Sequence, residues 1–340
     1  MAKIALLTPT FSQFSGIDRV VELNAEEFAK KNDVTIFTLK AGMKPKNARI
    51  KVIELGMPKN PFLERLYRLF FFLDCVKIRK YGKKLKDYDL IISHQYPMNL
   101  IAAYAKKHYG VKYIYHNHGV AYPRLFSNLP EKAYMHLFRF LTNLSVKKAD
   151  SAISISKYLQ KKLKEETGMN SKVVYDPIDK KRFHKGINGK KIRKKYNLGK
   201  SPVCLYVGRI SPHKGVHLLI KAFNLVLKEI PHAKLLIVGK PTFNQYSKKL
   251  KKISSKSVIF AGFVPDAQLP YYYAACDVYT TASLWEGFNM TVAEAQSCGK
   301  PVVAFNLCSH PEVVKKGILV KPKNIEEFAN AIIKLIKSKK

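Results

Sequence analysis

The sequence predicts an α/β protein with two domains, each with its own core, and three observations support this fold class. First, 340 residues are enough for two such domains. Second, short apolar runs alternate with segments whose apolar residues recur at helical spacing, which is typical of β-loop-α units. Third, a Lys-rich run at 180–200 separates the two halves. We therefore expect domains at 1–177 and 201–340, joined by a linker at 178–200.

The composition excludes several classes of protein. No stretch reaches the roughly 18 apolar residues of a membrane span, and the N-terminus is too short and abrupt for a signal peptide. The five cysteines are scattered and lie mostly inside apolar runs, which favours reduced core thiols over disulfides or a metal-binding knuckle. We therefore expect a cytoplasmic protein.

The net charge of +37 at pH 7 admits three explanations. The charge could serve to bind anionic lipid, it could serve to bind nucleic acid, or it could reflect a Lys- and Ile-rich proteome such as thermophiles show. The lysines are spread along the whole chain, which favours the last explanation at least as much as any binding role. In every case the charge accelerates the encounter with an anionic ligand.

The first half is expected to contain a series of parallel strands. The strands are predicted at 3–8, 34–39, 50–54, 89–93, 111–115, 151–155 and 172–175, with helices at 17–31 and 157–167. The loop at 9–16 follows the first strand and would face a ligand, because the carboxyl ends of parallel strands form the binding edge of such sheets. A plain connecting loop is the alternative.

Histidines follow two of these strands. His94 comes directly after the strand at 89–93, and His116 and His118 come after the strand at 111–115. Both strand ends should reach the same edge of the sheet. His116 and His118 could be taken for metal ligands, but a third and a fourth ligand are not evident from the sequence.

Two segments of the first half combine aromatic and basic residues. Pro61 opens a segment that runs to Lys86 as a predicted helix, with an apolar stripe and many Lys and Arg residues elsewhere. The stripe consists of Phe62, Leu66, Leu69, Phe70, Leu73 and Val76. Such a helix could lie on an anionic membrane or pack on the sheet with a solvated basic face. The segment 122–148 is a second candidate for contact with an acceptor or a membrane.

The second half repeats the alternation of strands and helices. Strands are expected at 203–208, 234–239, 258–262, 277–281, 301–305 and 318–320, with helices at 216–229, at 269–275, after Asn289, and from Ile325 onward. Gly299 and Pro301 mark the end of the helix that follows Asn289.

The segment 283–304 carries the strongest functional signal. Glu286 lies in a loop, and Glu294 lies on a helix of otherwise small and apolar residues, where a buried carboxylate needs a partner. Amides near Asn289 and Met290 at the helix N-terminus can hold an anion, while each carboxylate can accept hydrogen bonds from a sugar diol. These features together describe a nucleotide diphospho-sugar site. The alternative is two ordinary surface charges paired with lysines.

The motif resembles a known family. Glu286-Gly287-Phe288, followed by Glu294-Ala295 and Gly299-Lys300-Pro301-Val302, is similar to the signature of the retaining glycosyltransferases of family 4. This resemblance implies the GT-B architecture, α/β with two Rossmann-like domains facing across a cleft. Two departures from the family pattern occur: Ser15-Gly16 stands where the family has Gly-Gly, and Asp176-Pro177 stands where it usually has Asn-Gly.

The resemblance also implies a role for each site residue. Arg209 and Lys214 would clamp the donor diphosphate, since departure of a nucleoside diphosphate builds negative charge that fixed cations neutralise. Glu286 would bind sugar hydroxyls, Glu294 ribose hydroxyls, and His118 the reacting sugar. The expected catalytic residues are His118, Arg209, Lys214 and Glu286. The expected nucleotide-sugar-binding residues are Gly16, Gly208, Arg209, Lys214, Phe263, Val264, Glu286, Gly287, Phe288, Asn289, Met290 and Glu294.

The expected activity is transfer of a hexosyl unit from a nucleotide diphospho-sugar to a lipid-linked or other glycan acceptor, with retention at the anomeric carbon. The resemblance implies same-face attack without a metal, so no cofactor is expected. An anionic membrane surface remains a candidate partner, which would place the protein on the inner face of the membrane.

Two other functions stay open. A catalytically silent sugar-nucleotide-binding subunit would keep the fold but lose the clamp, whereas Arg209, Lys214, Glu286 and Glu294 are all present. A basic nucleic-acid-binding protein would explain the charge, but no recognised binding module is visible.

Overall fold

The computed structural model describes residues 1–12, 16–126, 128–242 and 244–338. The chain divides into two compact units, each with its own parallel sheet. Unit 1 comprises Met1–Pro123 and Asn128–Pro177, and unit 2 comprises Arg124–Ser127 and Ile178–Lys340. Each unit is therefore described by itself.

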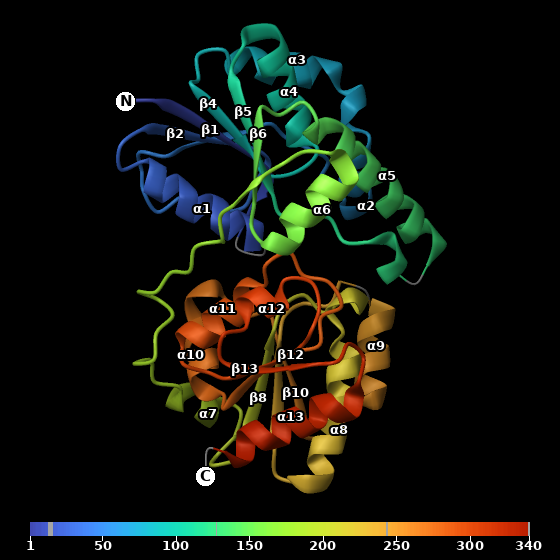
Figure 1. Cartoon of the computed structure of the whole chain (residues 1–340). Helices are drawn as coiled ribbons and strands as arrows, with labels where there is room; N and C mark the ends of the chain where they lie inside the picture. Colours follow the sequence, from blue (N-terminus) through green and yellow to red (C-terminus); the bar gives the residue numbers. More distant parts are fainter. Residues whose placement is uncertain (13–15, 127, 243, 339–340) are drawn as a thin grey trace. The chain divides into compact units, whose positions relative to one another are not determined.

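Unit 1 is built on a parallel sheet of seven strands in the order β3-β2-β1-β4-β5-β6-β7. The central strand β1 aligns Leu6 with Ile36 of β2 and with Ile92 of β4. Its elements, shown from blue to light green in Figure 1, are β1 Lys3–Phe11, α1 Gly16–Phe28, β2 Asp33–Ala41, β3 Lys51–Glu54, α2 Pro61–Leu69, η1 Phe71–Leu73, α3 Cys75–Lys84, β4 Leu90–Ser93, α4 Met98–Tyr109, β5 Lys112–Asn117, η2 Pro123–Leu125, α5 Leu129–Val146, β6 Ser151–Ser154, α6 Lys157–Thr167 and β7 Lys172–Val173.

Successive residues of β1 face two different cores, as the period of two in a strand requires. Ala5 and Leu7 pack with the α3 and α4 side of the sheet, whereas Ile4 and Leu6 pack with α1. Because both faces are covered, the strand reads as a continuous apolar run rather than an alternating one.

The segment 61–86 differs from the single helix that its pattern predicts. The helix is interrupted after Leu69, and a new helix starts at Cys75 because the Asp74 side chain caps it, accepting the Lys77 N–H at 2.9 Å. The Tyr67 hydroxyl also donates to Asp74, at 2.6 Å. Of the six apolar stripe residues only Leu69 is buried, and Phe71 fills the core in their place.

Unit 2 has a six-stranded parallel sheet in the order β10-β9-β8-β11-β12-β13. Leu205 of β8 aligns with Leu236 of β9 and with Tyr279 of β11. Its elements, from yellow-green to red in Figure 1, are α7 Lys190–Lys195, β8 Val203–Val207, η3 Pro212–Lys214, α8 Val216–Glu229, β9 Lys234–Val238, α9 Asn244–Ile253, β10 Val258–Gly262, η4 Asp266–Gln268, α10 Leu269–Ala275, β11 Val278–Thr281, α11 Met290–Ser297, β12 Val302–Phe305, α12 His310–Val313, β13 Gly317–Val320 and α13 Ile325–Lys337.

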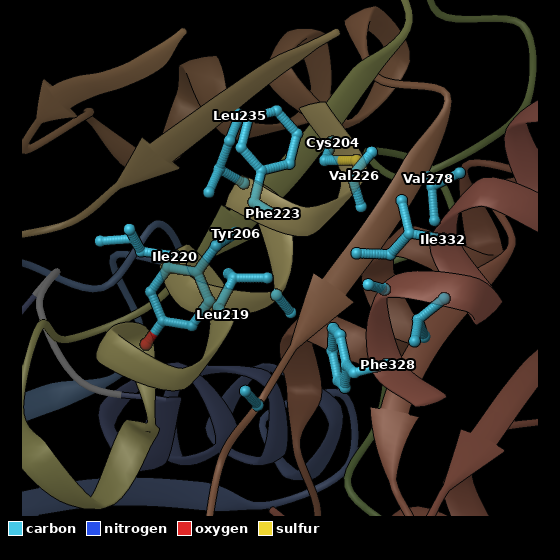
Figure 2. Packing of buried hydrophobic residues seen from close by; sticks show 14 of the residues in the cluster. Cys204, Tyr206, Leu219, Ile220, Phe223, Val226, Leu235, Val278, Phe328 and Ile332 are labelled. Atoms are coloured by element: carbon cyan, nitrogen blue, oxygen red, sulfur yellow. The ribbon is translucent and has the colours of Figure 1, made fainter. Parts of the chain in front are cut away.

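The main core of unit 2 lies between its sheet and the pair α8 and α13. Figure 2 shows Tyr206 of β8, Phe223 of α8 and Phe328 of α13 among the buried side chains of this core. On β11, Val278 belongs to this core, whereas the next residue, Tyr279, contacts Tyr273 of α10 instead. The helices α10 and α11 therefore pack against the opposite face.

Residues 178–200, which composition marks as a linker, are part of unit 2. Gly189 lies so close to α10 that a Cβ there would be 2.4 Å from the Ala275 nitrogen. Arg193 of α7 pairs with Asp277 at 2.7 Å, and the Tyr196 and Tyr272 hydroxyls are 2.9 Å apart. These contacts attach the basic segment to α10 and the start of β11.

The helices α4, α7, α9 and α12 lie in segments where the sequence analysis expected no helix. In the described part of the chain, no helix is both long enough and apolar enough to cross a membrane.

Candidate active site

In both units the strand order reverses beside the first strand. In unit 2 this point lies between β8 and β11, and in unit 1 between β1 and β4. Ligands of open parallel sheets bind at the carboxyl ends of the two strands that flank such a point. The residues predicted for the donor follow β8 and β11, so the topology brings them to one edge of unit 2.

Glycine positions the loop after β8. Gly215, with φ of 63°, caps the start of α8, and a Cβ there would lie 1.8 Å from the Ala282 carbonyl oxygen. Only glycine permits this approach. The main chain continues the contact, since the Leu284 N–H donates to the His213 carbonyl oxygen at 2.8 Å. The loops after β8 and β11 are thus held together through their backbones.

Lys214 and Glu286 form an ion pair across these two loops. The Lys214 Nζ donates to Glu286 Oε2 at 2.6 Å, and both side chains are largely buried. Burial acts to raise the pKa of Glu286, but the charge of Lys214 and its hydrogen bond outweigh that effect, so the pKa lies below its usual value. The site therefore presents a carboxylate and an ammonium together at neutral pH.

A chain of hydrogen bonds fixes the N-terminus of α11. The Tyr279 hydroxyl donates to Thr291 Oγ1 at 2.7 Å, and the Thr291 hydroxyl donates to Asn289 Oδ1 at 2.8 Å. Asn289 Nδ2 donates to His310 Nε2 at 2.9 Å, and His310 Nδ1 donates to the Phe305 carbonyl oxygen at 2.8 Å. Because both nitrogens of His310 are used in this way, its ring is neutral.

This network directs the Asn289 side chain away from the helix that it precedes. Asn289 has φ of 74°, and among the described residues its side chain caps no N–H of α11. The Ser309 hydroxyl donates to the Phe288 carbonyl oxygen at 3.1 Å, which holds the preceding turn. The first N–H groups of α11 therefore remain free of a side-chain cap, at the positive end of the helix dipole.

Glu294 is buried on α11 and has the partner that its position requires. The Tyr273 hydroxyl of α10 donates to Glu294 Oε2 at 2.7 Å. Burial raises the pKa of Tyr279, and the charges of Glu286 and Glu294 raise it further. Both carboxylates therefore lie close enough to Tyr279 to act on the pKa of its hydroxyl.

The remaining predicted residues of unit 2 lie along the same edge. Arg209 follows Gly208 and is exposed, and in the described ranges it makes no ion pair. Its carbonyl oxygen accepts from the Tyr206 hydroxyl at 2.9 Å. Phe263 and Val264 follow β10, two strands from β8, with Phe263 partly exposed under the Lys240 ammonium. Gly287 and Phe288 are buried between Glu286 and Asn289, and Met290 is the first residue of α11.

In unit 1, the structure describes only part of the loop that was predicted to face a ligand. Gly16 is the first residue of α1, but Ser15 and the rest of 13–15 lie outside the described residues. Asp18 of α1 is buried and accepts hydrogen bonds from Thr10 and from the Ser12 N–H at 2.8 Å. Burial nevertheless raises the pKa of Asp18 to about 6. Sequence analysis did not identify this acid, since its partners Thr10 and Ser12 are short polar residues at the other end of the loop.

His118 lies in a cluster of three buried imidazoles. His94, His116 and His118 come from the carboxyl ends of β4 and β5, and their ligand atoms all lie within 4.8 Å of one another. His94 Nδ1 and His118 Nε2 are 3.0 Å apart. Burial lowers the pKa of all three, that of His116 to about 4, so the rings are neutral at pH 7. His94 is thus the third imidazole that the sequence pattern did not reveal.

Next to this cluster, unit 1 contains a cavity of about 100 Å³ lined partly by His116 and Asp176. Asp176 Oδ1 is buried and has no hydrogen-bond partner among the residues described. Burial raises the pKa of Asp176 to about 8. This is the position at which the chain departs from the usual Asn of the family it resembles.

Two Rossmann-like units, with a cation and carboxylates at the switch point of the second, define the GT-B class of glycosyltransferases. A model of the family "Glycosyl transferases group 1" matches residues 188–340, and a model of "Glycosyltransferase Family 4" matches residues 14–182. The chain belongs to glycosyltransferase family 4.

Individual relatives agree with this assignment. An uncharacterised 41.2 kDa protein in the cps region of Klebsiella pneumoniae is 30% identical over 78% of this chain and 72% of its own length. The Escherichia coli O-antigen chain mannosyltransferase B is 31% identical, but over 42% of this chain and 39% of that enzyme. The crystal structure of Anabaena HepE with UDP and glucose superposes with a TM-score of 0.80 at 24% identity, covering 100% of this chain and 91% of HepE, which shows the common fold.

Proposed function

We propose that this glycosyltransferase moves a hexosyl unit from a nucleotide diphospho-sugar to a glycan acceptor, with retention at the anomeric carbon. The observation that carries the proposal is the Lys214–Glu286 pair at 2.6 Å beside the uncapped N-terminus of α11. The mannosyltransferase relative and the binding of UDP and glucose to HepE support a hexose and a nucleoside diphosphate.

The diphosphate would bind where positive charge is already fixed. Lys214 and Arg209 follow β8, and the N–H groups of α11 face the same edge from β11. When the glycosidic bond to phosphate breaks, the negative charge on the leaving diphosphate increases, and preorganised cations stabilise it without reorganisation. We propose that these groups serve in place of a metal ion in the transfer step.

Glu286 would accept hydrogen bonds from hydroxyls of the donor sugar. Its pKa lies below the usual value, so it is a carboxylate at neutral pH and can only accept. The bound sugar would share Glu286 with Lys214, which keeps the buried charge compensated throughout. Glu294 would accept from the ribose hydroxyls, with its carboxylate oriented by Tyr273.

The chemical step is proposed as same-face attack. The acceptor oxygen forms a bond to the anomeric carbon on the face from which the phosphate oxygen leaves, and the departing phosphate takes the proton of the acceptor hydroxyl. His118 is proposed to contact the reacting sugar. Its neutral ring can donate or accept one hydrogen bond there.

The acceptor is proposed to be lipid-linked, presented at an anionic membrane surface. Helices α2 and α5 contact each other, as Arg65 lies 5.3 Å from the centre of the Tyr134 ring, and both expose large apolar side chains. We call these side chains the α2–α5 surface; they are Phe62, Leu63, Leu66, Leu129, Leu137, Phe140 and Leu144. Exposed Arg65 and the basic face of α3 supply the positive charge that attracts anionic lipid.

A donor panel tests the proposed function. The thermal unfolding of the whole chain is measured with uridine, guanosine and adenosine diphospho-sugars and with the free diphosphates. A donor that binds the native state raises the melting temperature, by an amount that grows with its concentration. If none of these ligands shifts the transition at millimolar concentration, the proposed donor site is wrong.

A further inference from the structure

The cluster of His94, His116 and His118 has a composition that the transfer reaction does not require. All three side chains are at most 6% exposed, and they stack within 5.3 Å of one another between ring centres. Three uncharged imidazoles in one buried place provide three nitrogen lone pairs aimed into a small volume.

The hydrogen bonds of the cluster are incomplete. His94 Nδ1 and His118 Nε2 share one hydrogen bond, in which one of the two nitrogens carries the proton. His94 Nε2 and His116 Nε2 are buried and find no partner within the described part of the chain. Leaving a buried polar atom without a partner costs about 1–3 kcal/mol, and two such atoms on neighbouring rings need an explanation.

We propose that these three histidines bind one divalent transition-metal ion of the zinc type, with an exogenous molecule as the fourth ligand. Imidazole nitrogens suit Zn²⁺ and Co²⁺, whereas Mg²⁺ and Mn²⁺ prefer carboxylates, and the cluster contains histidine alone. In a tetrahedral site with Zn–N bonds of about 2.0–2.1 Å, the nitrogens lie about 3.3 Å apart. The 3.0 Å between His94 Nδ1 and His118 Nε2 is close to that value, and the ligand atoms of the three rings all lie within 4.8 Å of one another, so ring rotations complete the site. His94 Nδ1 is then the ligand atom and His94 Nε2 carries the ring proton, so the ion accounts for the unpartnered atom of His116 and not for that of His94.

The site differs from the transfer machinery of unit 2, which uses Lys214 and Arg209 in place of a metal. A bound ion occupies the lone pair of His118, so metal binding and contact of His118 with a sugar exclude each other. The inference does not rest on the proposed function, because metal binding can be measured with no donor or acceptor present.

Titration with Co²⁺ tests the proposal. The metal-free full chain is titrated and its visible absorption recorded. We expect saturation at one equivalent, with the visible bands of four-coordinate cobalt and without the intense near-ultraviolet band of a cobalt–thiolate bond. Zn²⁺ should displace the Co²⁺, as its affinity for nitrogen ligands is higher.

Variants locate the ion. His94→Asn and His116→Asn should each weaken binding by at least about 100-fold, since loss of a direct ligand costs more than loss of an outer-shell partner. His232→Asn, an exposed histidine of unit 2, and Cys75→Ser, an exposed thiol, should bind Co²⁺ as the wild type does. Circular dichroism in the presence of a chelator shows whether each variant is folded.

Three results would overturn the proposal. They are a wild-type titration without saturation at one equivalent, a spectrum with thiolate bands, and unchanged binding in a folded His116→Asn variant. The first two use the wild-type chain, so they decide the question even if the buried substitutions do not fold. Failure of the donor panel would leave the cobalt result untouched.

Discussion

The ligand edges of the two units differ in how their polar groups are satisfied. In unit 2, Lys214 pairs with Glu286, and Asn289 and His310 complete a chain of hydrogen bonds from Tyr279 to Phe305. In unit 1, the same edge holds neutral histidines and includes two buried ring nitrogens without a partner in the described ranges. The polar groups of the first edge are paired with one another, whereas two ring nitrogens of the second are not. These differences underlie the two proposals above, a charged donor at the first edge and a metal ion at the second.

The two units also differ in how many large apolar side chains they expose. Among the described residues, most of the exposed large apolar side chains lie in unit 1, with two groups of them on α2 and α5, whereas those of unit 2 are Phe263 and Tyr271. An apolar surface beside basic residues suits a partner that is itself both apolar and anionic. This comparison supports our proposal that unit 2 binds the donor and unit 1 the acceptor, and four experiments sharpen it.

The largest effect is expected for Lys214→Ala. Removing a preorganised cation at the leaving group should lower kcat by a factor on the order of 10³. Loss of the ion pair also leaves Glu286 buried and unpaired, which should cost about 3–5 kcal/mol of unfolding free energy. The measurement is steady-state transfer together with urea unfolding, and Lys228→Ala on the exposed end of α8 is the control.

A double variant separates these two effects. Adding Glu286→Gln to Lys214→Ala removes the unpaired charge and should recover most of the stability but none of the activity. An enzyme that stays within tenfold of wild type after Lys214→Ala would contradict the role of this cation.

The second effect concerns the α2–α5 surface. Replacing Phe62 and Leu63, both more than half exposed, by serine should weaken binding to anionic vesicles by about tenfold or more, since each buried apolar side chain contributes about 1.5–3 kcal/mol. Stability should change by no more than about 0.5 kcal/mol. Vesicle co-sedimentation measures the binding. Tyr271→Ser, an exposed aromatic of unit 2, is the matched control, and an equal loss in that variant would argue against a surface specific to unit 1.

The third effect is on the stability of unit 2. His310→Ala leaves Asn289 Nδ2 and the Phe305 carbonyl oxygen without their partner and should cost about 2–4 kcal/mol. Trp285, the single tryptophan of the chain, lies in unit 2, so its fluorescence in urea reports on this unit. His232→Ala should leave the midpoint unchanged. An unchanged urea midpoint for His310→Ala would show that the hydrogen-bond chain does not stabilise the site.

The smallest effect is a pH dependence in unit 1. The pKa of Asp176 is raised to about 8 from an ordinary value of 3.8, so the folded chain keeps a proton that the unfolded chain releases between these values. Stability is therefore lost as the pH rises through this window. The other titratable groups that line the cavity are His116 and Tyr175. Asp176→Asn should match the wild type near pH 3.5, below the window, and exceed its melting temperature by about 5 °C at pH 9.

Two results would contradict the assignment of this pH dependence to Asp176. One is a melting-temperature difference between Asp176→Asn and wild type that does not change with pH. The other is an equal gain from Asp87→Asn, a change of an exposed carboxyl group in the same unit.

The sequence predicted the strands of both sheets well because buried parallel strands are continuous apolar runs bounded by polar residues. It also predicted that Glu294 is buried and needs a partner. It could not identify that partner, because Tyr273 lies on a different helix and looks like the two tyrosines that precede it. His310 was missed for the same reason, since its role depends on Asn289, 21 residues away.

The helix predicted over 61–86 was wrong because a local side-chain contact prevailed over the apolar period. Asp74 caps a second helix, and the phenylalanine that reaches the core is Phe71 rather than a residue of the stripe. His94 was within reach of prediction. It follows a strand adjacent to that of His116 and His118, and neighbouring parallel strands end at one edge.

The contact of Gly215 with Ala282 has a consequence for altering this enzyme. The distance between the lysine and the glutamate is determined by two stretches of main chain in van der Waals contact, not by the attraction of their charges. Side chains that line the donor can therefore be exchanged to favour another sugar while this spacing is kept. Any residue larger than glycine at 215 would change it for every donor at once.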